Sequence, residues 1–184
     1  MTSSKLKYLV LGIALAVTVP VGAQLMYGVA FNGGGVVGTI TNNDATTGNI
    51  GEYLSTTVAT ASAVSLTTAT AKDVMTLALT PGDWDVSAMV QHKPAATTSI
   101  TVLSCSISPT ADTMNTQPGG SGIGTDPIVT LGQAAQVNAL EVSQSITPVR
   151  VSVAAATTLH LVCKDTFTVS TMGAYGTIRA RRMR

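Results

Sequence analysis

The chain has 184 residues, a net charge of +1 and only 10% charged residues, while Ser and Thr make up roughly a quarter of it. This composition excludes intrinsic disorder, which requires high charge and low hydrophobicity, and it gives no overall field that would attract nucleic acid. It is typical of β-sheets whose outward faces carry hydroxyl groups in place of ions, as in virion proteins and extracellular adhesins.

Residues 1–31 form an apolar N-terminal segment in which Lys5 and Lys7 precede a long uncharged run. Three interpretations stay open. The basic start, the apolar run and the small residues before Gln24 are typical of a cleaved secretory signal. Residues 8–31 are also long enough to cross a membrane, which takes about 20 apolar residues. In the third interpretation the segment is a hydrophobic arm buried by neighbouring subunits.

Residues 32–51 are rich in Gly, Asn and Thr and show no helical period, which predicts an extended connector. Residues 52–184 then form the main domain. Their short alternating runs, separated by Pro and Gly turns, predict an all-β sandwich or barrel. The strands are expected around residues 64–67, 75–79, 84–88, 100–107, 149–153, 159–164, 167–169 and 175–180.

Three irregular segments stand out within this domain. A change of parity at Val102–Leu103 predicts a β-bulge. Residues 132–139 are the only piece compatible with a helix, and residues 112–126 are expected to form a long loop. Loops of that length usually carry a function or move.

The stretch "LTPGDWDVSAMV", residues 79–90, holds the only tryptophan, Trp84, between Asp83 and Asp85. Carboxylates that hydrolyse a glycosidic bond flank it from two sides, at least about 5 Å apart, whereas residues two apart on one strand point the same way. A calcium site would need further oxygen ligands at regular spacing. The stretch therefore predicts the start of a strand whose tryptophan enters a core shared with Leu77, Val86, Val102, Leu161, Cys163 and Phe167.

The histidines and cysteines show no catalytic or zinc spacing, so we expect no enzyme activity, cofactor or metal. His92, in the polar sequence "QHKP", is expected to be an exposed loop histidine. His160 is expected to point outward, toward a subunit interface or solvent. Cys105 and Cys163 lie in alternating apolar runs, where two buried free thiols are the first interpretation. A cross-strand disulfide is the alternative and requires an oxidising setting.

The C-terminal sequence "RARRMR" carries four arginines: Arg179, Arg181, Arg182 and Arg184. They are interpreted either as a solvated tail or as a docking strip for an acidic partner surface. We expect Arg179 and Arg181 to pair with carboxylates within an oligomer of this chain, Asp85 and Asp165 first among them. Arg182 and Arg184 are expected to lie at the end, free to meet another protein.

Several stretches together resemble a family of small proteins of tailed phages and prophages. They are a Gly-Glu-Tyr entry at residue 51, "LTPGDWDV", "SISPT" and the ending "YGTIRARR". The resemblance covers residues 51–184, and the long apolar N-terminal segment departs from it. It implies a jelly-roll sandwich similar to tumour-necrosis-factor-like and phage fibre-head domains.

The resemblance also implies a function, namely a non-enzymatic virion structural protein of a phage head, collar or tail. We expect a homotrimer, because a three-fold interface can bury faces rich in Thr, Val and Ala. Its expected partners are other virion proteins and host surface polysaccharide, with no nucleic acid. The alternative is a secreted or membrane-anchored bacterial surface protein of the same fold. In either case, the candidate core or interface residues of the domain are Trp84, Phe167, His160, Cys105 and Cys163.

Overall fold

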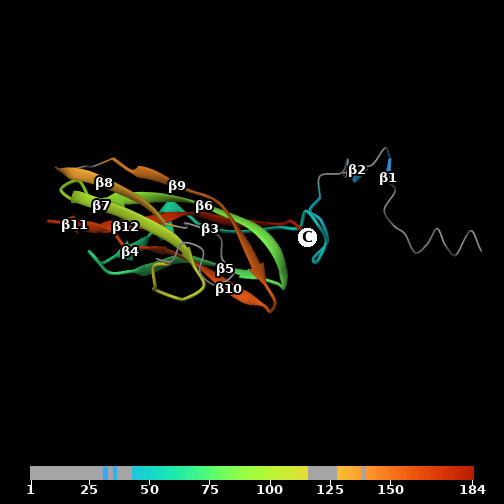
Figure 1. Ribbon diagram of the computed structural model, residues 1–184. Coiled ribbons are helices and arrows are strands. Elements are labelled where there is room, and N and C mark those ends of the chain that lie inside the picture. The colour runs from blue at the N-terminus through green and yellow to red at the C-terminus, as the bar shows by residue number, and fades with distance from the viewer. Residues whose placement is uncertain (1–30, 33–34, 37–42, 116–127, 138–139) are drawn as a thin grey trace, which may run out of the picture. The chain divides into compact units, whose positions relative to one another are not determined.

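The computed structural model describes residues 31–32, 35–36, 43–115, 128–137 and 140–184 (Figure 1). The interpretations of residues 8–31 therefore lie outside the described residues, except at Phe31, and so does most of the expected loop at 112–126. Within the described ranges, no helix is long and apolar enough to span a membrane.

The chain divides into two compact units, Met1–Asn43 and Asp44–Arg184. In the first, β1 (Phe31–Asn32) pairs with β2 (Gly35–Val36) in an antiparallel hairpin. The second unit includes residues 44–51, which the sequence assigned to a connector. These residues are held by backbone hydrogen bonds, among them one from the Gly51 N–H to the Arg182 carbonyl at 3.0 Å.

The second unit consists of two antiparallel sheets, and the prediction of an all-β fold is confirmed. The first sheet has the order β3 (Tyr53–Val58), β12 (Met172–Arg182), β6 (Gly82–Pro94) and β9 (Val142–Val153), with β4 (Val64–Leu66) also pairing with β12. The second has the order β5 (Lys72–Leu79), β10 (Thr157–Cys163) and β7 (Ser99–Ser108), and both β8 (Ile128–Val137) and β11 (Thr166–Thr168) pair with β7. This arrangement is compatible with a β-sandwich. The described helical structure is one turn, η1 (Thr60–Ser62).

The eight main strands pair in a nested pattern. β3, the first of them, pairs with β12, the last, and β5 pairs with β10. Inside these, β6 pairs with β9 and β7 pairs with β8. In the sequence each pair therefore encloses the next one, and successive pairs alternate between the two sheets.

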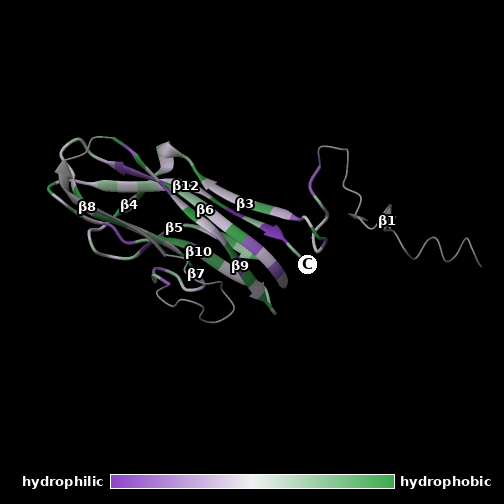
Figure 2. Cartoon of the chain, turned by 45° about the horizontal axis from the view of Figure 1, so that its top comes forward, coloured by the Kyte–Doolittle hydropathy of each residue, from purple (hydrophilic) through white to green (hydrophobic). Residues whose placement is uncertain are grey.

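The core lies between the sheets and follows the predicted alternation. In Figure 2, green apolar segments alternate with white or purple polar ones along several strands. Trp84, Leu77, Val86, Leu161, Cys163 and Phe167 all belong to the buried cluster. Val102 does not, because a register shift between Ile100 and Val102 turns the strand so that Ile100 and Leu103 fill the core.

Residues 132–139 were the one piece compatible with a helix, but residues 132–137 are a strand, and residues 138–139 lie outside the described residues. Residues 128–137 form β8, which pairs with β7 over seven registered positions from Ser106↔Ile128 to Ser99↔Val137. Long-range pairing with a neighbouring strand overrides the weak helical preference of this short segment.

One close approach within the first sheet requires glycine. Gly176 in β12 has φ +149°, and a Cβ atom at this position would lie 2.0 Å from the Met89 carbonyl oxygen of β6. Glycine adopts this conformation without steric cost. It lets the last strand lie tightly against β6.

Candidate functional site

The outer face of the first sheet carries two rows of uncharged side chains that cross its strands in register. In one row Thr57, Thr177, Met89 and Ser145 lie opposite one another on β3, β12, β6 and β9. In the next row Tyr175, Gln91 and Ser143 do the same. We call these seven residues the hydroxyl face. Their inward-pointing neighbours, such as Ala88, Val90 and Ile178, are buried in the core.

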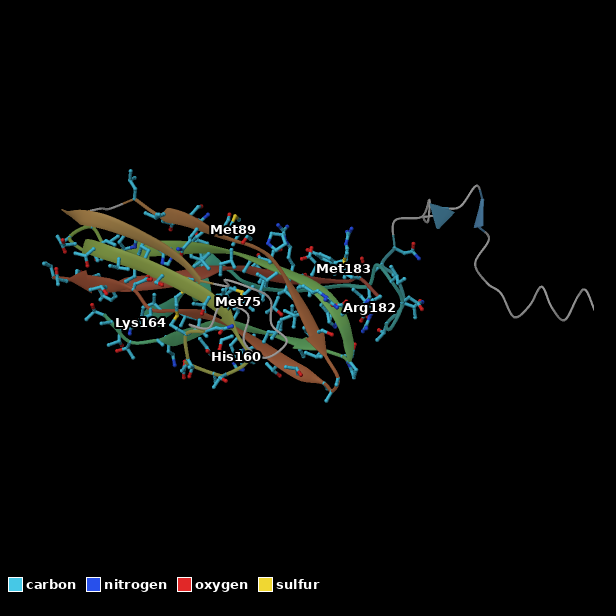
Figure 3. All side chains as sticks on the ribbon, viewed as in Figure 1. Met75, Met89, His160, Lys164, Arg182 and Met183 are labelled. Carbon is cyan, nitrogen blue, oxygen red and sulfur yellow. A yellow bond between two sulfur atoms is a disulfide. The ribbon has the colours of Figure 1, made fainter. Side chains whose placement is uncertain are left out.

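The hydroxyl face bonds largely to itself. The Thr57 and Thr177 hydroxyls lie 3.0 Å apart, and the Gln91 amide donates to the Ser143 hydroxyl. Met89 projects from the middle of the face with 47% of its surface exposed (Figure 3). This surface carries few ions, four of its five hydroxyls are partnered, and its centre is a flexible apolar side chain. Such a surface is suited to contact with another protein surface.

Charged groups border the hydroxyl face at its ends. At one end the Tyr175 hydroxyl donates to Glu141 at 2.5 Å, and this hydrogen bond raises the pKa of Tyr175. Toward the other end Arg179 donates from Nε to the Ser87 hydroxyl at 3.0 Å. Beyond it, Tyr53, Arg181 and Asp85 lie in register. The uncharged rows thus have a charged boundary along the strand direction.

Arg182 lies in the interior, next to the C-terminal end of β12 (Figure 3). Its guanidinium donates from Nε to the Glu52 carboxylate at 2.8 Å and from Nη1 to the Pro81 carbonyl at 2.8 Å. The side chain is only 4% exposed. Burial alone would raise the pKa of Glu52, but the Gly48 N–H and the Arg182 guanidinium together lower it. The pair is therefore a buried, fully partnered ion pair.

Asp83 accepts from two further arginines. Arg150 donates from Nε and Nη2 to the two carboxylate oxygens, at 2.8 and 2.9 Å. Arg184 approaches Oδ2 at 2.7 Å. The hydrogen bond from Arg150 is the main cause of the lowered pKa of Asp83, and Arg184 adds to it. Both arginines are largely exposed, so these contacts belong to the rim of the sandwich.

The expectation that Arg182 and Arg184 stay free was wrong, because both pair with carboxylates of the same chain. The expected pairing of Arg179 and Arg181 within a trimer stays a prediction. Arg179 bonds to Ser87, and Asp165 is buried against His92, where it cannot meet Arg179 or Arg181. Among the four, Arg179 and Arg181 are the ones that lie on the exposed outer side of β12.

His92 was expected to be an exposed loop residue, and this was also wrong. It lies in β6, is completely buried, and bonds from Nδ1 to the Asp165 carboxylate at 2.7 Å. Its Nε2 lies 3.0 Å from Gln144 Oε1 and 3.7 Å from Cys105 Sγ. These partners come from β9, β7 and the segment after β10. The polar sequence around His92 concealed the burial, because the groups that satisfy it are distant in the chain.

Cys105 and Cys163 form a disulfide between the paired strands β7 and β10. The first interpretation, two free thiols, was wrong, and the alternative left open by the sequence is the one found. Among the other candidates, Trp84 and Phe167 lie in the core. His160 lies on the outer side of β10 and bonds from Nδ1 to the Asp73 carboxylate at 2.6 Å.

Comparisons of this chain with protein-family models, with curated proteins and with solved structures find no match. The hydroxyl face is consequently the candidate functional site on the strength of its own geometry.

Proposed function

We propose that this protein is a non-enzymatic structural component of a phage virion and that it works as a homotrimer with a tumour-necrosis-factor-like jelly-roll body. The observation that carries the proposal is the hydroxyl face. A broad, uncharged sheet face is the kind of surface that symmetric self-association buries. The stretches from Gly51 to Arg184 that resemble tailed-phage proteins supply the virion setting.

The nested strand pairing supports the jelly-roll assignment. A jelly roll contains eight strands in two sheets and two Greek keys. It arises when a long antiparallel ribbon, in which the first strand pairs with the last, folds over on itself. The pairs β3–β12, β5–β10, β6–β9 and β7–β8 follow that scheme.

The sheet that carries the hydroxyl face is large enough for association. Four strands about 4.8 Å apart span about 19 Å, and the eleven residues of β12 at about 3.4 Å extend about 37 Å, so the sheet presents at most about 700 Å². A stable interface takes ~800 Å² from one partner, so the trimer contact centres on the hydroxyl face and extends over its charged borders. Met89 at its centre would meet its symmetry mates near the three-fold axis.

The trimer is tested by the variant Met89→Arg in the full chain, with light scattering as the measurement. Wild type is expected at three times the 18.7 kDa chain mass. The variant should be monomeric with an unchanged far-ultraviolet spectrum, because three desolvated guanidiniums would repel one another. The matched control is Val169→Arg, at a residue that is 81% exposed in the β11–β12 turn. A monomeric wild type, or a Met89→Arg variant that stays trimeric, would contradict the proposal that the hydroxyl face forms the trimer interface.

The virion role needs a separate measurement. Particles released from cells that carry the gene should contain this chain in a fixed ratio to the other particle proteins, as seen by peptide mass spectrometry after density-gradient purification. Its absence from intact particles would contradict the virion proposal without affecting the trimer.

A bacterial surface protein of the same fold is the second candidate, and the Cys105–Cys163 disulfide favours it. Disulfides persist in oxidising settings such as the periplasm, secreted proteins and cell or virion surfaces. This candidate predicts the chain in the envelope or secreted fraction of cells that release no particles. If the chain is only a virion component, the envelope and secreted fractions of cells that release no particles should not contain it.

A further inference from the structure

A set of metal-binding side chains lies enclosed within the sandwich, away from the hydroxyl face. His92 comes from β6, Gln144 from β9, Cys105 from β7 and Cys163 from β10, so both sheets contribute. His92, Cys105 and Asp165 place one ligand atom each within 4.8 Å of the others. The side chains are all buried, so the cluster is shielded from solvent.

The spacing of the His92, Gln144 and Cys105 atoms is close to that of ligands around one tetrahedral ion, and opening of the disulfide lets the second sulfur move into place. Zinc bonds of about 2.0–2.1 Å to nitrogen or oxygen and about 2.3 Å to sulfur place neighbouring ligand atoms about 3.4 to 3.8 Å apart. His92 Nε2 lies 3.7 Å from Cys105 Sγ and 3.0 Å from Gln144 Oε1. Cys163 lies directly opposite Cys105 in the β7–β10 pair and shares a disulfide with it.

We propose that reduction of the Cys105–Cys163 disulfide converts this cluster into a binding site for one soft divalent cation of the Zn²⁺ type. A dithiol reductant gives two electrons and two protons to the disulfide and becomes a cyclic disulfide itself. The two cysteine thiols then lose their protons to solvent as they bind the ion, so two thiolates balance its two positive charges. His92 Nε2 gives up the proton that it donates to Gln144 Oε1 in the oxidised form, and these two atoms complete four ligands.

The thiolate and imidazole donors select this class of ion. Thiolates prefer Zn²⁺ and other soft ions, whereas Ca²⁺ and Mg²⁺ require sets of oxygen ligands. Two thiolates also balance the charge of one divalent ion, and the remaining buried carboxylate, Asp165, keeps hydrogen bonds from His92 and the Ser104 N–H, as a buried charge requires.

Asp165 acts as a positioning residue in this site. It accepts the Nδ1–H of His92 at 2.7 Å, and its other oxygen accepts the Ser104 N–H at 3.2 Å. A carboxylate that holds the far nitrogen of a ligating histidine fixes the ring and directs its second nitrogen to the metal. In this cluster the second nitrogen points toward Cys105 and Gln144.

The disulfide and the metal centre use the same sulfur atoms and therefore exclude each other. Thiols persist in a reducing cytosol, and disulfides persist outside it. A chain that passes from one setting to the other would exchange an ion for a covalent bond at the same point between β7 and β10. This inference goes beyond the proposed virion role and does not depend on it.

The test uses Co²⁺ as a spectroscopic probe on the full chain, in two redox forms. One sample is reduced with a phosphine under inert gas, and the other keeps its disulfide. We expect the reduced form to bind one Co²⁺ per chain with intense thiolate charge-transfer and tetrahedral ligand-field bands, which one equivalent of Zn²⁺ removes. The oxidised form has the same sequence and should show none of these bands. Equal spectra in both forms, or no thiolate bands on reduction, would overturn the proposal.

A second measurement applies if the chain loses its folded structure when the disulfide is reduced. If the reduced chain unfolds, Zn²⁺ should restore its β-sheet circular dichroism, since a structural ion contributes to folding. Failure of Zn²⁺ to do so would overturn the proposal as well.

Variants separate a metal ligand from a merely buried side chain. Asp165→Asn should weaken Zn²⁺ binding of the reduced chain about 10- to 100-fold with unchanged stoichiometry. His92→Ala should lose the tetrahedral bands. His160→Ala is the matched control, because this histidine lies on the outer side of β10, and it should keep wild-type binding. Equal binding by the His92 and His160 variants would contradict the assignment.

Discussion

The guanidinium carbon of Arg182 lies 4.2 Å from the centroid of the Trp84 ring, and its Nε donates to Glu52. Cation–π contacts of this kind are worth about 2 kcal/mol when they are desolvated. Three parts of the chain therefore meet at one point, namely the last strand, the entry to β3 and the start of β6. The contact explains why a strand that ends in arginines can end inside the protein.

Replacing Trp84 by alanine should destabilise the fold by about 3–5 kcal/mol, the usual loss for a large buried aromatic. Trp84 is fully buried, and its indole N–H donates to the Thr80 carbonyl at 3.0 Å. Chemical denaturation of the variant measures the effect, with Tyr53→Ala as the partly exposed control. A loss below about 1 kcal/mol would contradict the central place of Trp84 in the core.

Arg182→Met should cost about 3–5 kcal/mol, because it leaves the Glu52 carboxylate buried without its ion-pair partner. Arg181→Met, one residue earlier on the exposed side of β12, should change stability by less than about 0.5 kcal/mol. The double variant Arg182→Met with Glu52→Leu should recover most of the loss, since it removes both charges. Equal effects of the two arginine substitutions would contradict the buried pair.

Gly176→Ala should destabilise strongly, by more than about 2 kcal/mol, or prevent folding. The added Cβ meets the Met89 carbonyl oxygen in the backbone of β6, and φ of +149° is costly for any side chain. Gly173→Ala in the same strand is the control, because its nearest neighbour would be Ala63 Cβ at 3.4 Å. Thermal unfolding of both variants checks the difference, and similar midpoints would contradict the close approach of β12 to β6.

Acidic pH should lower the free energy of unfolding, because it protonates the carboxylates of Asp83 and Glu52. Arg150 and Arg184 lower the pKa of Asp83, and that of Glu52 is lowered by Gly48 and Arg182 against the effect of burial. A lowered folded-state pKa stabilises fully above the unfolded value of about 4, and this contribution is lost as the pH falls through the folded value.

Midpoints of thermal unfolding across this pH range provide the measurement. Asp83→Asn should be less stable than wild type at neutral pH, and the difference should vanish at strongly acidic pH. The exposed control Asp44→Asn should follow the wild-type curve. A difference that persists unchanged into acid would mean that Asp83 acts through its shape and not its charge.

Strand positions were accessible from sequence because alternation reports directly on which face is buried. The parity of Ile178 and Ala180 also places Arg182 on the inward side, so that signal for its burial was present in "RARRMR". It was outweighed by the general rule that arginines near a chain end are solvated. Glu52, whose carboxylate compensates the charge of the buried Arg182 guanidinium, lies 130 residues away in sequence.

The environment of His92 had no comparable local signal. Its partners Gln144 and Cys105 lie on other strands and Asp165 lies between β10 and β11, so only the strand order brings them together. The Cys105–Cys163 pairing depends on the register of β7 with β10 in the same way. Hydrophobic periodicity predicts which residues face inward, but it does not say which inward residues meet.

The place of β12 has a consequence for how the protein is made. This strand is synthesised after all the other described strands, yet it lies between β3 and β6 in the middle of its sheet. Until Arg182 has left the ribosome, β3 lacks its partner and one side of β6 stays unpaired. Contacts of such high sequence separation slow folding and leave strand edges exposed meanwhile. The nascent chain therefore depends on slow translation, chaperones or rapid self-association to avoid aggregation during that interval.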